Sequence, residues 1–150
     1  MSAASAIRAK LRADTAVVAA VGENISPQYT PGNPFPRIVY EVLDDDTGIT
    51  HDGPVRLTKA PIIVHCMARA LSGIFPYKEA RALAALAKHA LESKKGDAYR
   101  VLWGDTVIQK CFHRGNTERE LTPSDTGETG RVVLVSHRFD LWYEEPLEPS

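Results

Sequence analysis

The alternating stretch from Arg131 to Tyr143 limits the possible folds more than any other part of the chain. Its apolar residues recur at every second position, at Val133, Val135, Phe139, Leu141 and Tyr143. Successive side chains of a β-strand point to opposite faces, so this spacing predicts a strand with one face in the core. His137 shares that face, and we interpret it as a core or cross-strand histidine because no metal-spaced partner accompanies it. We expect Glu144, Glu145 and Pro146 to end the strand.

A strand of this length needs paired neighbours, and three other stretches are typical of strands. They are Arg37–Leu43, Val55–Ala68 and Val107–Arg114. Pro61 lacks the N–H that a central strand donates, so the second stretch is bulged there, lies at a sheet edge there, or starts after it. The pattern predicts a sheet of about four strands, mainly antiparallel or mixed.

Three helices are predicted beside this sheet. The first covers residues 3–13, and Asp14 then suits the N-cap of a short helix over 15–21 that ends at Gly22. The main helix begins at Pro76 and runs to about Glu92. It carries a stripe of mostly small apolar residues at Ala80, Leu83, Ala84, Ala87, Ala90 and Leu91. Small side chains allow close approach to strands, so we expect helices to cover one sheet face in a single α+β domain over residues 1–150.

Four polar or proline-rich stretches separate these elements. Ile25–Pro36 is interpreted as an extended connection, and Ser93–Asp105 as a turn-rich segment. Asp44–Asp46 opens a loop that could bind a divalent ion weakly, but the spacing of its carboxylates matches no known metal motif, and a solvated loop is the simpler interpretation. Gly115–Gly130 has only one large apolar residue and predicts a long mobile hairpin arm.

Charge and composition exclude several classes of protein. The chain has 18 Lys and Arg against 19 Asp and Glu, a net charge of -1, which counts against an autonomous DNA-binding protein. No signal pattern or membrane-spanning apolar run is found, so we expect a cytosolic protein at the time of synthesis and no membrane partner. Cys66 and Cys111 lack metal spacing and are predicted to be buried free thiols.

The sequence contains no nucleotide-binding, zinc-protease or hydrolase motif, so we predict no catalytic, cofactor or metal site. Interleaved charges on the arm suit a protein partner instead. The candidate interface residues are Asp44, Asp45, Asp46, Arg114, Thr117, Glu118, Arg119, Glu120 and Asp125. The residues alone indicate a binding or assembly module, with a small adaptor or an unrecognised enzyme domain of a bacterial system as the alternatives.

Five segments in order resemble the tail-completion proteins of long-tailed bacteriophages and prophages. They are Leu11–Gly22, Pro36–Tyr40, Ile63–Ala68, Glu79–Leu83 and Phe139–Pro146. Each is short and mostly apolar, so their order and spacing carry the resemblance, which spans nearly the whole chain. The sequence departs from the family pattern at Pro61 and over Ser93–Asp105.

The resemblance implies a tail-terminator or head-tail joining role. Such a protein forms a ring, typically a hexamer, that caps the finished tail tube and presents a surface to the head connector. Its partners would be other copies of itself, the tail-tube protein and a connector or head-completion protein, while DNA passes through the lumen without specific binding. The expected location is the tail or neck of the virion, and the host cytoplasm during assembly.

Overall fold

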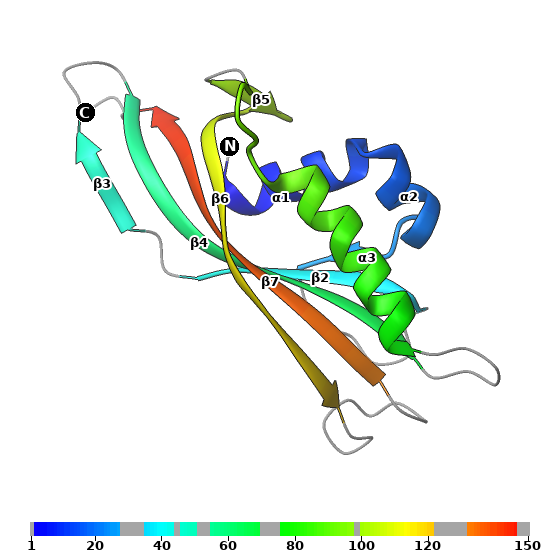
Figure 1. The fold of residues 1–150 in the computed structure, drawn as a ribbon. Coiled ribbons are helices and arrows are strands. Elements are labelled where there is room, and N and C mark those ends of the chain that lie inside the picture. Colours follow the sequence, from blue (N-terminus) through cyan, green and yellow to red (C-terminus); the bar gives the residue numbers. More distant parts are fainter. Residues whose placement is uncertain are drawn as a thin grey trace.

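The computed structural model describes residues 2–27, 35–43, 46–50, 55–69, 76–97, 100–121 and 132–146. Its three helices are α1 (Ala3–Ala13), α2 (Thr15–Val21) and α3 (Pro76–Leu91). Its strands are β1 (Ile25–Ser26), β2 (Arg37–Val42), β3 (Asp46–Thr50), β4 (Val55–Arg69), β5 (Val101–Trp103), β6 (Thr106–Leu121) and β7 (Val132–Pro146). All strands join one seven-stranded sheet in the order β1-β2-β4-β7-β6-β5, with β3 also paired to β4 (Figure 1).

The stretch from which the sequence analysis began forms the centre of this sheet. β7 pairs antiparallel with β4 along its whole length, from Val132 opposite Arg69 to Pro146 opposite Val55. The predicted core face of β7 is confirmed, and the His137 side chain lies buried on it. The expected stop at Glu144 is wrong, because β4 continues far enough to provide partners for the last residues of β7.

Pro61 interrupts neither β4 nor its pairing with β7, in which it lies opposite Asp140. On the other side of β4, β2 ends at Val42, and the carbonyl of Pro61 accepts a hydrogen bond of 2.8 Å from the N–H of Leu43. The nitrogen and carbonyl of one strand residue point to the same side, so the missing N–H faces the gap between β2 and β3. The sequence left three alternatives for Pro61: a bulge, a sheet edge or a later strand start. The structure adopts the sheet edge, since neither β2 nor β3 pairs with β4 at Pro61 itself.

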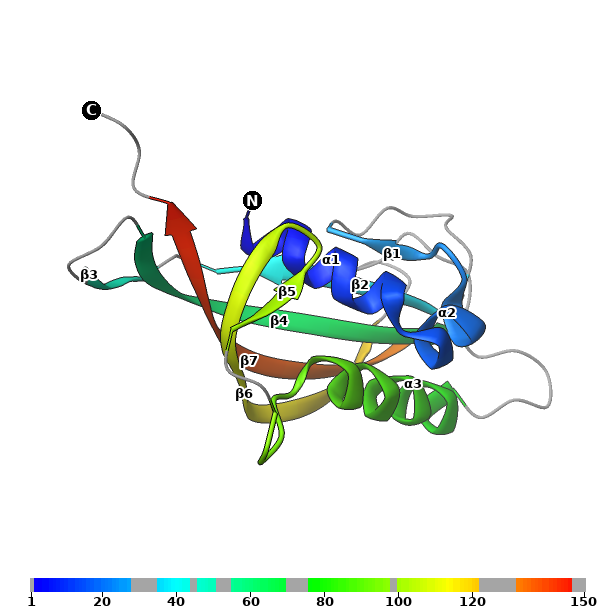
Figure 2. The same cartoon turned by 90° about the horizontal axis from the view of Figure 1, so that it is seen from above.

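The helices pack on one face of the sheet, and the sheet curls around them (Figure 2). α3 lies against β4 and β7, and its predicted apolar stripe is entirely buried. α1 contacts β1 and β2 at one end of the strand order and β5 and β6 at the other. A flat sheet could not bring both ends to one helix, so the expectation of simple one-face cover is corrected to a curled sheet that surrounds the helix layer.

The helix ends follow the sequence signals. The backbone N–H of Val17 donates to the Asp14 carboxylate at 3.0 Å, so Asp14 caps α2 as predicted while it also terminates α1. Gly22 ends α2 with a positive φ of 61°, a conformation that costs glycine little.

The short strands and the extension of β6 correct the sequence analysis. β1 and β3 lie within segments expected to be connections or loops, and β5 lies within the segment expected to be turns. β6 continues through Leu121, so the first part of the expected arm is a paired strand, while residues 122–131 lie outside the described part of the chain. Each of these segments gains ladder hydrogen bonds from a neighbouring strand, which outweighs its weak apolar pattern.

Candidate protein interface

The side of the sheet that faces away from the helices is called here the outer face. At its centre it is formed by Ile63 and His65 of β4, Ser136, Arg138 and Asp140 of β7, and Arg114 and Thr117 of β6. These residues alternate with the buried residues of the same strands, as the period of two requires. A small apolar cluster lies at one end of this face and contains Val39, Met67, Leu121 and Val132. None of these four residues belongs to a helix.

A chain of hydrogen bonds crosses three strands of the outer face. His65 lies directly opposite Ser136, and its Nδ1 is 2.6 Å from the serine hydroxyl. Its Nε2 is 3.0 Å from a carboxylate oxygen of Glu41 on β2. A one-residue slip of any of these strands would move its side chain to the other face, so the chain of bonds favours the observed register.

Serine, histidine and glutamate in contact also form the groups of a hydrolase, which was one alternative from the sequence. The acid of a catalytic triad is buried, whereas the Glu41 side chain is 49% exposed. We therefore interpret Glu41, His65 and Ser136 as a structural polar cluster. Sequence reasoning missed it because residues from three separate strands meet only once the register is known.

A shallow pocket of about 300 Å³ opens beside Ser136. It is lined by Ile63, Arg114, Gly115, Asn116, Thr117, Ser136 and Arg138. Arg114 donates from Nε to the Asp140 carboxylate at 2.6 Å and lies over the Phe112 ring. Arg138 is exposed and forms no ion pair with any residue in the described part of the chain. The pocket therefore presents a guanidinium group that is available to an anionic partner.

A bulge in β6 shapes this pocket. The pairing with β7 shifts register between His113 and Gly115, and Gly115 has a φ of 147°, which residues with a side chain rarely adopt. The bulge turns the strand locally and brings Arg114 and Thr117 to the same pocket. Arg138 alternates with the apolar residues of β7, so the period of two could have marked it as a residue of the exposed face.

The remaining predicted interface residues that the structure describes do not line this pocket. Glu118 is on the helix side of β6, where Arg81 of α3 donates to its two carboxylate oxygens at 2.6 and 2.8 Å. These hydrogen bonds lower the pKa of the Glu118 carboxyl below its usual value. Arg119 and Glu120 are exposed on β6, and Asp46 begins β3. Asp44, Asp45 and Asp125 lie outside the described residues.

Two histidines lie between the sheet and α3 on the helix side. His113 Nε2 is 2.8 Å from His137 Nδ1, and both rings lie near Phe139. Burial, followed by the neighbouring His113 and Lys88, lowers the pKa of His137 to about 4. Burial and then Lys88 also lower the pKa of His113. This pair is neutral near pH 7 and belongs to the core, as predicted for His137.

The two thiols also belong to the interior. Cys66 and Cys111 are both buried and free, as the sequence predicts. Burial raises the pKa of each thiol far above its usual value. Neither is therefore a reactive nucleophile at neutral pH.

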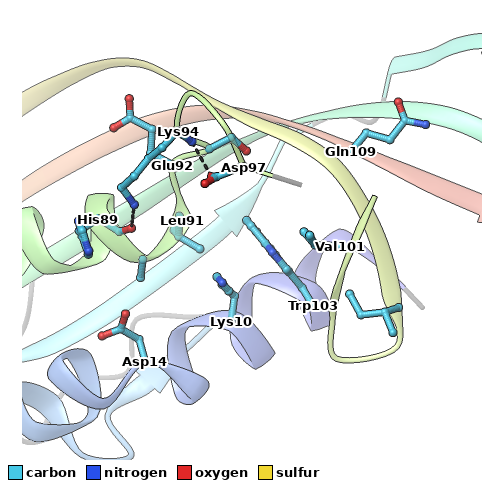
Figure 3. Close-up of a pocket in the computed structure, with 13 residues that line it drawn as sticks. Lys10, Asp14, His89, Leu91, Glu92, Lys94, Asp97, Val101, Trp103 and Gln109 are labelled. Atoms are coloured by element: carbon cyan, nitrogen blue, oxygen red, sulfur yellow. Dashed lines mark hydrogen bonds between the residues drawn. The ribbon is translucent and has the colours of Figure 1, made fainter. Parts of the chain in front are cut away.

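A second pocket, of about 410 Å³, lies where α1, α3 and β5 meet (Figure 3). Its charged side chains are largely engaged with the chain itself. Lys94 Nζ donates to the carbonyl of His89 at 2.8 Å, and the Lys94 N–H donates to Asp97 at 2.6 Å. Lys10 lies over the Trp103 ring. We interpret the Lys94 contacts as a cap on the C-terminal end of α3, and the Lys10 contact as packing of α1 against β5.

The described residues contain no cluster of three or more histidine, cysteine or acidic side chains that could hold a metal ion. No helix among them is long and apolar enough to cross a bilayer. The acidic segment Asp44–Asp46, for which a weak ion site was considered, lies mostly outside them.

Comparison with other proteins gives two positive results. The fold is similar to that of a chain in the solved virion of a native gene transfer agent (GTA) particle, with a TM-score of 0.63 over 93% of this chain and 92% of that one, at 16% sequence identity. Comparison with curated protein sequences gives no match. Residues 5–139 match the family described as Tail completion protein gp17. The chain therefore belongs to the Tail completion protein gp17 family, a family of bacteriophage structural proteins.

Proposed function

We propose that the protein forms a ring that caps the tail tube and joins the finished tail to the head connector. Membership of the tail completion family, across residues 5–139, is the observation that carries this proposal. The similar fold of a chain from the gene transfer agent particle supports it. The protein would act in the tail or neck of the virion, after assembly in the host cytoplasm.

The proposed mechanism is steric. A ring offers the tube one complementary face and no second copy of that face, so polymerisation of the tube stops. The outer face suits protein contacts because it combines Arg138 and Arg114 with the partly exposed aromatic rings of Phe112 and Trp142. Arginine and aromatic residues are enriched at the energetic centres of protein interfaces.

DNA would cross the lumen without specific binding. The net charge of -1 provides no large excess of Lys and Arg for the many phosphate contacts that tight DNA binding requires. Weak binding is what a conduit needs, because DNA must move past the ring.

Deletion of the gene from its phage and complementation in trans would test the capping role. We expect the deletion to give tails of abnormal length that do not join heads, and the wild-type chain to restore both properties. Tails are scored by negative-stain electron microscopy and infectivity by plaque counts. Normal tails and full infectivity in the deletion phage would overturn the proposal.

The hairpin tip between β6 and β7 needs a separate variant. Replacement of residues 122–130 by a two-residue turn keeps β6 and β7 intact, whereas a deletion from Thr117 would remove part of a paired strand. We expect a folded chain that assembles poorly onto tails, since the tip is proposed as a contact. Full complementation by this variant would remove the tip, including Asp125, from the proposed interface.

A further inference from the structure

The middle of the outer face, where β6 and β7 lie side by side (Figure 1), carries more positive than negative charge. Lys110 and Arg119 of β6 lie opposite outer-face residues of β7. Arg114 and Arg138 line the pocket that lies between them along the strands. Asp140 is the one acidic residue that these described stretches of β6 and β7 place on the outer face. We call the four cations the basic strip.

Three cations of the basic strip have no anionic partner in the described part of the chain. Arg114 donates to Asp140 through Nε at 2.6 Å, which uses the one carboxylate nearby. Lys110, Arg119 and Arg138 form no ion pair with any described residue. The helices lie on the opposite face of the sheet (Figure 2). The basic strip is therefore complementary to a partner surface that supplies carboxylates.

The pocket in the middle of the strip has the size and the donors for one acidic side chain. None of its described lining residues is acidic, and its volume of about 300 Å³ is at the low end for ligand sites. The guanidinium of Arg138 can donate two parallel hydrogen bonds to one carboxylate. The side chains of Asn116 and Thr117 form no hydrogen bond with a described residue and are exposed, so both remain available as further donors.

We propose that the basic strip docks an acidic segment of a neighbouring virion protein, with one Asp or Glu side chain of that segment bound to Arg138 in the pocket. This inference rests on the joining role proposed above and names the chemistry of the partner. Ile63 of the pocket and the Phe112 ring, which is 43% exposed, add apolar contacts beside the charges. Arginine and aromatic side chains together are typical of the energetic centre of a protein interface.

Nucleic acid is a poorer occupant of the basic strip. Tight binding of a duplex depends on many phosphate contacts, whereas the strip offers three unmatched cations with the Asp140 carboxylate among them. The concave pocket with an apolar wall at Ile63 suits a protein side chain better than a phosphate backbone.

A titration followed by ¹⁵N NMR tests the site on the intact chain. The probe is the blocked peptide acetyl-Gly-Glu-Glu-Gly-amide, and the same peptide with glutamine in place of glutamate is the control. We expect saturable shifts of the Arg138 Nε–H signal and of the Gly115 and Thr117 amide signals with the glutamate peptide alone. Absence of saturable shifts, or equal shifts with the glutamine peptide, would overturn the site.

Substitutions identify the group that binds the carboxylate. Arg138→Gln should weaken peptide binding by roughly tenfold or more, because it removes a charged hydrogen-bond donor. Arg138→Lys should recover only part of the affinity, since lysine lacks the planar fork. Arg8→Gln is the matched control, because Arg8 is also exposed and forms no ion pair with a described residue but lies on α1. Equal weakening by Arg138→Gln and Arg8→Gln would overturn the site in favour of a general charge effect.

Two further measurements decide between occupants. A short DNA duplex is titrated at the same salt concentration, and tighter binding of the duplex than of the peptide to the same residues would overturn the protein contact. Sedimentation of the wild-type and Arg138→Glu chains should give the same oligomeric state. Self-association that is lost in Arg138→Glu would assign the strip to a second copy of the chain and would overturn the proposed partner.

Complementation of the deletion phage separates this site from the capping role. A chain with Arg138→Glu should restore few infectious particles, whereas Arg8→Glu should restore full infectivity. Full infectivity with Arg138→Glu would overturn the docking site and leave the capping role standing. Normal tails in phage that lack the chain would overturn the capping role itself, and the peptide titration would still decide whether the pocket binds a carboxylate.

Discussion

The two faces of β7 differ in chemistry although they belong to one strand. On the helix side, Val133, Phe139 and Leu141 are buried against α3 and the other strands. On the outer face, Ser136 and Asp140 form hydrogen bonds to neighbouring strands, and Arg138 is exposed. The comparison teaches that stability and recognition can be assigned to alternate residues of the same strand. Substitutions one residue apart should therefore affect different properties.

The largest expected effect comes from the helix side. Phe139→Ala should lower the free energy of unfolding by about 3–5 kcal/mol, because the ring is fully buried and its removal leaves a cavity. The adjacent Arg138→Ala is the matched control, and its exposed side chain should change stability by about 0.5 kcal/mol or less. Urea unfolding measures both. Equal losses from the two variants would refute the division of roles between the faces.

The histidine pair gives the next effect, through pH. The folded protein lowers the pKa of His137 from its usual value of 6.5 to about 4, so the unfolded chain binds more protons between these values. Stability is then fully present above pH 6.5 and is lost as the pH falls toward 4, by at most about 3 kcal/mol. Chemical unfolding measured across this pH range checks the prediction.

Two variants separate this histidine from the other titrating groups. His137→Gln should flatten the dependence on pH between 6.5 and 4, whatever its effect on stability at neutral pH. His89→Gln, which removes an exposed histidine, should keep the slope of the wild-type chain. If His137→Gln kept the full dependence of stability on pH, His137 would not be the source of that dependence.

Glu144 limits the simple contrast between the faces, because it alternates with the core residues of β7 and is nevertheless buried. Arg100 donates to its two carboxylate oxygens at 2.6 and 3.1 Å. Arg100→Ala leaves this buried carboxylate without its cation and should lower stability by about 2 kcal/mol. Arg100→Lys should recover part of the loss. An unchanged unfolding midpoint for Arg100→Ala would show that the carboxylate is satisfied without its arginine.

The smallest effect is expected at the end of β6, where both faces are polar. Glu118→Gln removes the ion pair with Arg81, which is exposed to solvent and screened by salt. The global unfolding midpoint should not change measurably, but amide hydrogens near Glu118 should exchange faster. Arg119→Gln, which removes a charge on the opposite face of the same strand, is the control. Equal exchange in the two variants would show that the ion pair does not hold the strand to α3.

The sequence predicted the elements whose own pattern was strong. The alternation of β7 and the alanine-rich stripe of α3 are each sufficient signals, as are the capping groups at Asp14 and Gly22. β5 and β3 were missed because they are short and gain their order from a neighbouring strand. The two-residue Gly104-Asp105 turn between Trp103 and Thr106 was a usable hairpin signal.

The lining of the outer-face pocket could be predicted only in part. Arg114 and Thr117 were proposed as contact residues from local charge, and the structure places both in the outer-face pocket. Glu118 was proposed on the same grounds and faces α3 instead, because the bulge at Gly115 sets which residues reach each face. A register shift of this kind depends on the pairing of two strands and is not visible in either one alone.

The position of β7 has a consequence for folding during synthesis. β7 lies between β4 and β6, yet the ribosome makes it after both. Until β7 emerges, the long edge of β4 has no partner on that side and is open to wrong pairing with other nascent chains. Productive folding is therefore a late event, and a slow codon stretch just before residue 132 would lengthen the period in which the chain is exposed to aggregation.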